Sequence, residues 1–177
     1  PRARERLAAV LPEAAGVGRF RVASVAYAGA PGYAAGTGYT GEDGFEVMTS
    51  VAAGKALFEA LAGASCVPCG LAARDSLRLE AALPLHGSDI DETTSPWEAG
   101  LGWALELDHE FIGRDALVAS KETATKRLTC IVSDGTGVLR SHQDVYHDGA
   151  VASLTSGGFA PMLERGIGLA YLPRALA

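Results

Sequence analysis

The chain has 177 residues, 48% of them hydrophobic, which is enough to build one sizeable domain or two small ones. Its 15 basic and 21 acidic side chains give a net charge of -6, and this acidic balance argues against a nucleic-acid partner. No apolar run approaches the roughly 20 residues that cross a bilayer, and the charged opening residues do not resemble a signal peptide. We therefore expect neither a nucleic-acid partner nor a membrane span.

The first third of the chain is predicted to mix helices and strands. Helical spacing marks residues 2–11 and 54–64, with Leu57, Phe58 and Leu61 on one side of the second helix. Strand patterns cover residues 19–28 and 44–50, and the glycines and proline of residues 29–38 predict a loop between them.

In the remaining two thirds of the chain, mixed helix and strand patterns give way to a series of short strand patterns. A helix that opens at Gly70 is predicted within residues 69–80, and alternating apolar residues predict a half-buried strand over 101–107. The polar residues 118–126 are expected to connect this part to a set of short strands at 127–132, 144–155 and 166–172, with a hairpin turn at Asp148-Gly149. The prediction is therefore an α+β portion over residues 1–122, followed by a small all-β portion over residues 123–177.

The three cysteines do not form a disulfide scaffold, because their number is odd and the chain is long for one. They fit a reducing compartment, which is the cytoplasm or, in a eukaryote, the mitochondrial matrix. Cys66 and Cys69 form a C-x-x-C pair, but His142 and His147, the only candidate partners, are too distant in sequence for a zinc finger. We predict no metal site.

Residues 36–41 read G-x-G-x-x-G, the spacing of a dinucleotide-binding loop. Such a loop follows a buried strand and opens a helix, whereas here a strand pattern follows. Glu42 and Asp43 would also place negative charge against a pyrophosphate. The interpretation we favour is a turn between two strands, with Gly41 and Gly44 at positive φ. This leaves open whether Glu42, Asp43 and Glu46 all face solvent or one faces inward.

Arg74 and Arg78 lie four residues apart on one face of the helix predicted over residues 69–80, with Asp75 beside them. They form either an exposed pair in local salt bridges or a guanidinium group directed into a cleft. A guanidinium in a cleft would suit a planar or anionic ligand.

Four segments together resemble one family. They are TGYTGEDGFEV at residues 37–47, the long block CGLAARDSLRLEAALPLHGSDIDETTSPWEAGLGWALELDHEFIGRDAL at 69–117, GVLR at 137–140 and LTSGGFAP at 154–161. Their order and spacing resemble the aminomethyltransferase (T-protein) family of the glycine cleavage system. The resemblance implies a ferredoxin-like α+β portion of a folate-binding fold, followed by a small C-terminal antiparallel β-barrel.

The resemblance also implies an activity and its binding residues. The family transfers a one-carbon unit to tetrahydrofolate from an aminomethyl group carried on the lipoyl arm of the H-protein, giving methylenetetrahydrofolate, ammonia and reduced lipoyl. Glu46 and Arg74 match the family's folate contacts, and a carboxylate can accept from the adjacent N–H donors of a pterin. Trp103 matches a family aromatic that could stack on the ligand, although a core role fits it nearly as well.

Departures from the family pattern limit what is carried over. The family's catalytic aspartate lies in an N-terminal stretch without a counterpart here, so no catalytic residue is assigned. We expect a C-terminal half of a longer protein, with weak or no turnover by itself. Two alternatives stay open: the folate domain of a sarcosine- or dimethylglycine-type dehydrogenase, and a non-catalytic folate-binding module.

Overall fold

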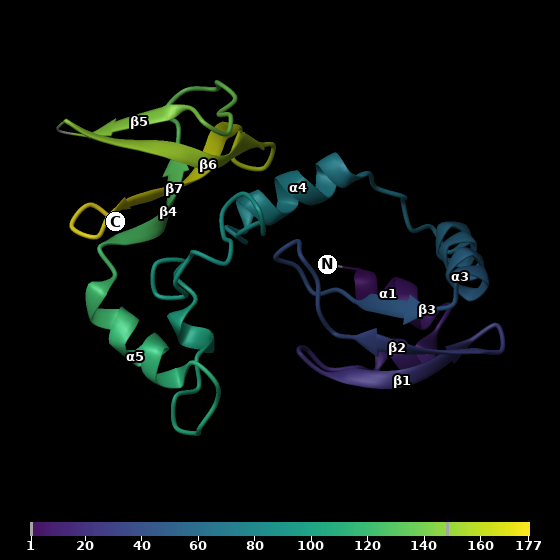
Figure 1. The fold of residues 1–177 in the computed structure, drawn as a ribbon. Coiled ribbons are helices and arrows are strands. Elements are labelled where there is room, and N and C mark those ends of the chain that lie inside the picture. Colours follow the sequence, from purple (N-terminus) through teal and green to yellow (C-terminus); the bar gives the residue numbers. More distant parts are fainter. Residues whose placement is uncertain (1, 148) are drawn as a thin grey trace. The chain divides into compact units, whose positions relative to one another are not determined.

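The computed structural model describes residues 2–147 and 149–177 (Figure 1). By its internal packing the chain forms two compact units, residues 1–74 and 75–177, and the division falls within one helix, α4 (Leu71–Glu80). Both units combine helices with antiparallel strands, which confirms the predicted α+β class. The predicted domain ranges, 1–122 and 123–177, rest on the change from mixed helix and strand patterns to strand patterns in the sequence, and they stay a prediction.

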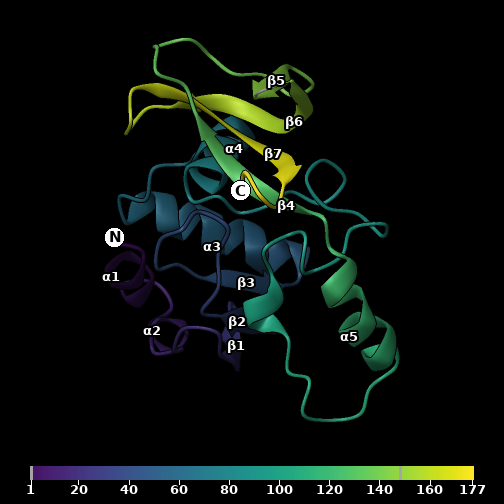
Figure 2. The ribbon, with the colours of Figure 1, turned by 90° about the vertical axis from the view of Figure 1, so that its left-hand side faces the viewer.

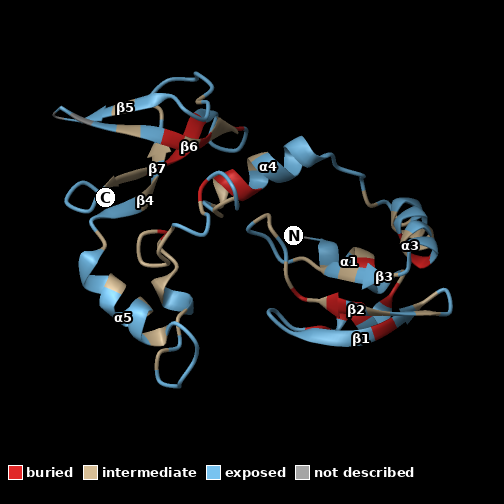
Figure 3. Ribbon diagram, in the orientation of Figure 1, coloured by how far each residue is buried: buried red, intermediate tan, exposed pale blue. Residues whose placement is uncertain are grey.

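The first unit is a three-stranded sheet with helices. Its elements before α4 are α1 (Ala3–Ala8), α2 (Pro12–Ala15), β1 (Val22–Tyr27), β2 (Ala30–Ala35), β3 (Glu46–Thr49) and α3 (Val51–Gly63). The antiparallel strands lie in the order β1-β2-β3. Figure 3 shows buried residues on β1, β2, α1 and α3. One core joins α1, α2, the sheet and α3 through Leu7, Leu11, Ala14, Val25, Ala34 and Leu57.

The predicted loop over residues 29–38 is wrong, because Ala30–Ala35 is the central strand of this sheet. Proline is disfavoured in a central strand, since it cannot donate to the ladder. Pro31, however, lies beyond the end of the β2–β3 pairing, which begins at Gly32 and Thr49, so only β1 pairs with it. Gly32 is required for close approach: a Cβ there would lie 2.4 Å from the Met48 carbonyl oxygen. The residues that suggested a loop therefore permit tight pairing.

Helix α3 begins at Val51, three residues before the predicted start at residue 54. Ser50 caps it, because its hydroxyl accepts a hydrogen bond from the Ala53 N–H at 3.3 Å. Leu57 is buried and Leu61 packs partly against the core, but Phe58 is 60% exposed. The predicted apolar side is therefore correct for the two leucines, which lie four residues apart, and wrong for Phe58.

The second unit is built on a four-stranded antiparallel sheet. Its elements after α4 are η1 (Gly102–Ala104), α5 (Arg114–Thr123), β4 (Lys126–Val132), β5 (Asp144–His147), β6 (Ala150–Ala160) and β7 (Arg165–Pro173). The strand order is β4-β7-β6-β5, which Figure 2 shows from the side. The three predicted strand runs are confirmed. The hairpin between β5 and β6 is also confirmed by their pairing, although Asp148 of its predicted turn lies outside the described residues.

Two predictions for the second unit are wrong. Residues 101–107 form no strand: Gly102–Ala104 is a turn of 3-10 helix, and Trp103 is 79% exposed while Leu101, Leu105 and Leu107 are half-buried. Alternating burial of the leucines thus arises without strand pairing. The polar run 118–126 was expected to be a connection, yet it is helical as far as Thr123.

A buried ion pair organises the second unit. Arg78 of α4 donates to Asp89 Oδ2 at 2.8 Å, and both residues are almost fully buried. Ser156 and Thr155 of β6 donate to the two oxygens of the same carboxylate, and the Leu85 N–H donates at 2.8 Å. The Tyr171 hydroxyl of β7 donates to the Asp89 carbonyl at 2.8 Å. Burial raises the pKa of Tyr171, so its phenol stays a donor through the neutral range. Asp89 therefore ties α4, the loop after it and β6 together through its carboxylate, and β7 through its backbone carbonyl.

Replacing Asp89 by Asn should destabilise the second unit by about 3–5 kcal/mol, because the Arg78 charge would stay buried without its counter-charge. The control is Asp75→Asn, which removes an Arg78 partner that is 51% exposed and should cost about 1 kcal/mol or less. Urea unfolding followed by tryptophan fluorescence measures this unit specifically, because both tryptophans of the chain, Trp97 and Trp103, belong to it. Equal losses in the two variants would contradict the role given to Asp89.

Candidate functional site

The glycine-rich segment 36–45 is a loop that joins β2 to β3, as the favoured interpretation predicts. No helix follows it, so the arrangement that places a pyrophosphate at a helix N-terminus is missing. Gly36 bridges to Arg19, exchanging backbone hydrogen bonds of 2.9 Å with Phe20 and Arg21. A Cβ on Gly36 would lie 2.2 Å from the Gly18 carbonyl oxygen. This glycine therefore serves backbone packing.

The predicted positive φ is correct for one of the two glycines named. Gly41 has φ 75°, whereas Gly44 is not among the residues of positive φ. The three carboxylates of this region also differ in their surroundings. Asp43 pairs with Arg4 at 3.2 Å, which gives it a structural partner. Glu42 and Glu46 are both exposed.

Glu46, the predicted folate contact, is the first residue of β3 and pairs across the ladder with Ala35. The Glu46 side chain is exposed. It therefore does not face inward, as we would expect of a residue that binds an enclosed pterin. The Thr37 hydroxyl donates to Glu46 Oε2 at 2.5 Å. This contact fixes one carboxylate oxygen and orients the group at the base of the loop.

Arg74, the second predicted contact, lies on α4 with its guanidinium carbon 4.5 Å from the centre of the Tyr39 ring. Within residues 2–147 and 149–177 it forms no ion pair, so no described residue neutralises its charge. Its neighbour Arg78 has the opposite environment, since it is buried and paired. The two arginines are therefore not the exposed pair that one interpretation predicted.

The loop 36–45 contacts both predicted folate residues, Glu46 through Thr37 and Arg74 through Tyr39. All four residues belong to the first unit. Sequence reasoning missed Thr37 and Tyr39. The signal was present, because both occupy the variable positions of the G-x-G-x-x-G string, but the glycines drew attention to the backbone.

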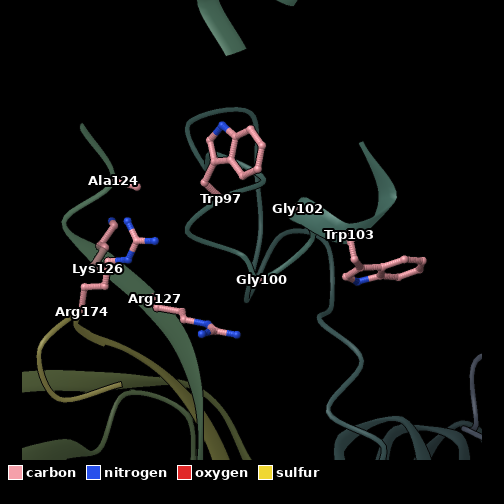
Figure 4. Close-up of a pocket in the computed structure, with 8 residues that line it drawn as sticks. All are labelled: Trp97, Gly100, Gly102, Trp103, Ala124, Lys126, Arg127 and Arg174. Atoms are coloured by element: carbon pink, nitrogen blue, oxygen red, sulfur yellow. The ribbon is translucent and has the colours of Figure 1, made fainter. Parts of the chain in front are cut away.

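Trp103, the third predicted residue, belongs to the second unit and lines a hollow there together with Trp97 (Figure 4). Its ring is largely exposed, so the core alternative considered for it does not hold. Glu46 and Arg74 belong to the first unit, so Trp103 is not part of the same unit as the other two predicted folate contacts.

In the described part of the chain, the cysteines and histidines do not come together in a common metal or redox site. All three cysteines are free; Cys66 is half-buried, and Cys69 and Cys130 are exposed. Among the described residues, the side chains close enough to share a cation are Glu106, Asp108 and His109, whose ligand atoms lie within 4.8 Å of one another and are exposed. Such exposed acidic groups are common without a metal, and this cluster supports no metal site.

Across residues 2–147 and 149–177, no helix combines the length and the apolar character needed to cross a bilayer.

The fold and the loop define a class: an α+β unit with a polar and aromatic loop, followed by an antiparallel β unit. Two family models match this arrangement, the GCVT N-terminal domain over residues 1–109 and the glycine cleavage T-protein C-terminal barrel domain over residues 126–177. The chain belongs to the glycine cleavage T-protein family.

Individual relatives agree with this assignment. The aminomethyltransferase of Synechococcus elongatus is 47% identical in an alignment 163 residues long that covers 90% of this chain and 44% of the relative. That of Neisseria meningitidis serogroup A is 43% identical in an alignment 180 residues long that covers 98% of this chain and 49% of the relative. The crystal structure of glycine cleavage system aminomethyltransferase T from Bartonella henselae superposes with a TM-score of 0.84 at 33% identity, covering 95% of this chain and 49% of that one. The chain thus spans about half the length of these relatives.

Replacing Gly36 by Ala should destabilise the first unit by about 1–3 kcal/mol, because the added methyl group meets the Gly18 carbonyl. Gly38→Ala is the matched control in the same loop, where a Cβ would meet nothing within 4 Å, and its effect should stay within about 0.5 kcal/mol. Thermal unfolding by circular dichroism measures both. Equal melting temperatures would show that the close approach at Gly36 imposes no constraint.

Proposed function

We propose that this chain carries the folate-contacting part of an aminomethyltransferase of the glycine cleavage system. The observation that supports it most directly is the loop 36–45, whose contacts hold a carboxylate, Glu46, and an unneutralised guanidinium, Arg74, in a chain of this family. The activity is a one-carbon transfer to tetrahydrofolate from an aminomethyl group on the lipoyl arm of the H-protein. The relatives described above favour it over the folate domain of a dehydrogenase.

The residues present fit a reduced pterin. The adjacent N–H donors of a pterin need a carboxylate acceptor, and Glu46 has an oxygen beyond the one that Thr37 contacts. Arg74 offers a planar set of donors, and its stacking on Tyr39 restricts the orientation of that plane. Tetrahydrofolate, when bound, supplies the nitrogen atoms that accept the one-carbon unit.

The protein's own part in this function is binding and orientation. Glu46 and Arg74 would fix the folate by charge-assisted hydrogen bonds, and Thr37 would keep the carboxylate in its accepting orientation. Trp103, which lies in the second unit, is proposed as a stacking contact on the strength of its match to the family. We assign no general acid or base to this chain. The lipoylated H-protein is the proposed partner, and the bacterial relatives support the expected cytoplasmic location.

Calorimetry with tetrahydrofolate tests the carboxylate. Glu46→Ala should weaken binding by about 1–3 kcal/mol, because the ligand's N–H donors would lose a charged acceptor. Glu59→Ala is the matched control, an exposed carboxylate on α3 of the same unit, and should leave the dissociation constant unchanged. An unchanged constant for Glu46→Ala would refute the assignment.

Arg74→Lys should also weaken folate binding, since an ammonium group reproduces neither the planar donors nor their stacking on Tyr39. The expected loss is about 1–3 kcal/mol in the same titration. Affinity equal to that of the unaltered chain would give Arg74 a structural role. A turnover assay with aminomethylated H-protein, run beside the titrations, separates an enzyme from a non-catalytic folate-binding module, and we expect weak or no turnover.

A further inference from the structure

The side chain of Arg4 joins helix α1 to the loop 36–45, and both belong to the first unit. Its Nε and Nη2 atoms donate to the two oxygens of the Asp43 carboxylate, each at 3.2 Å. The guanidinium carbon also lies 4.7 Å from the centre of the Phe45 ring. Because Phe45 packs partly against the core of this unit, the ion pair extends the fixed part of the loop back to Asp43.

Other contacts of Arg4 fix the orientation of its guanidinium group. Its Nη1 atom donates to the backbone carbonyls of Ala15 and Val17, at the C-terminal end of α2, the second at 3.0 Å. Both of these residues are buried. Helix α1 is itself held in the core through Leu7. Since α2 engages one nitrogen of the planar group, the other two donors are already oriented for a bidentate carboxylate, and Asp43 meets them.

The loop is therefore anchored near both of its ends. At its start, Gly36 bridges to the segment that precedes β1. Near its end, Arg4 holds Asp43. Thr37 and Tyr39, which contact the two predicted folate residues of the first unit, lie between these anchors. A segment fixed at both ends has fewer conformations open to it, so the second anchor restricts where these two side chains can lie.

We propose that Arg4 is a positioning residue for the folate site: through Asp43 it keeps Thr37 and Tyr39 against the two predicted folate contacts. The inference rests on the proposed function, since the order of the loop affects ligand binding only if those contacts bind folate. Arg4 acts through other residues and is given no contact with the ligand. Molecules with an ordered loop bind at full affinity, so losing the ion pair weakens the apparent affinity at most by the factor by which it opens the loop.

Asp43→Ala in the 177-residue chain tests the proposal, because Arg4 keeps its contacts with α2 in this variant. The ion pair is half exposed and therefore weak, so backbone amides of the loop should exchange hydrogen about fivefold faster, measured by mass spectrometry. Calorimetry should show tetrahydrofolate binding weakened by about twofold to fivefold. Charge alone predicts the opposite sign, since tetrahydrofolate ends in an anionic glutamate and removal of a nearby negative charge would strengthen its binding.

Two further variants separate positioning from a general effect on stability. Asp43→Glu keeps a carboxylate for Arg4, so it should restore both loop exchange and folate affinity to values close to those of the unaltered chain. Glu5→Ala is the matched control, because it breaks a different, exposed ion pair at the start of the same helix, with Arg2 at 2.8 Å. It should leave the exchange of the loop and the folate affinity unchanged.

Three results would overturn the proposal: unchanged or tighter folate binding by Asp43→Ala, faster exchange across the whole first unit rather than in the loop, or an equal loss in Asp43→Glu. The titration of Glu46→Ala distinguishes this failure from that of the proposed function. If Glu46→Ala weakens binding and Asp43→Ala does not, the folate contacts stand and Arg4 has no positioning role. If the unaltered chain does not bind tetrahydrofolate, the proposed function fails and the positioning role fails with it.

Discussion

The buried ion pair of Arg78 and Asp89 is the interaction on which the second unit depends. Charges removed from water carry a desolvation cost that only good geometry and additional hydrogen bonds offset. Asp89 meets both conditions, since Arg78, two hydroxyl groups and a backbone N–H surround its oxygens. Among the described residues no buried side-chain nitrogen or oxygen lacks a hydrogen-bond partner. A carboxylate satisfied from so many directions specifies where α4 and the strands must lie, which an apolar contact of the same area would not do.

Sequence patterns predicted the fold where local chemistry and tertiary packing agree. The strand runs of β4, β6 and β7 and the glycine-rich turn between β2 and β3 all carry a local signal. Prediction failed where a distant partner decides. Gly32 and Pro31 suggest a loop, and only the neighbouring strand β3, which ends at Thr49, shows why both are tolerated in β2. The alternation around Trp103 suggests a strand, but no strand of the described chain pairs with it. Strand pairing depends on residues distant in sequence, so the local spacing of apolar residues does not predict it.

The site was predictable to a different degree from the fold. Glu46 and Arg74 were predicted as folate contacts by resemblance, whereas their residue types and spacing left open whether each faces solvent or a cleft. The geometry adds two residues, Thr37 and Tyr39, and gives each a contact: a hydroxyl on the carboxylate and a ring beneath the guanidinium. Both come from the loop whose glycines imitate a dinucleotide fingerprint. The same string therefore serves backbone packing through Gly36 and, through Thr37 and Tyr39, contacts the side chains of Glu46 and Arg74.

Helix α4 shows how one short segment can hold two arginines in opposite environments. Arg74 and Arg78 differ by four residues, and so by about one turn, yet one guanidinium is exposed over an aromatic ring and the other is buried on a carboxylate. Substitution of the buried arginine would destabilise the fold, because the Asp89 carboxylate would be left charged and buried without a counter-charge. The exposed arginine has no counter-ion among the described residues, so its charge is available to an anionic or planar ligand. Sequence identity alone cannot assign these two roles, because the residue type is the same; burial and partners decide between them.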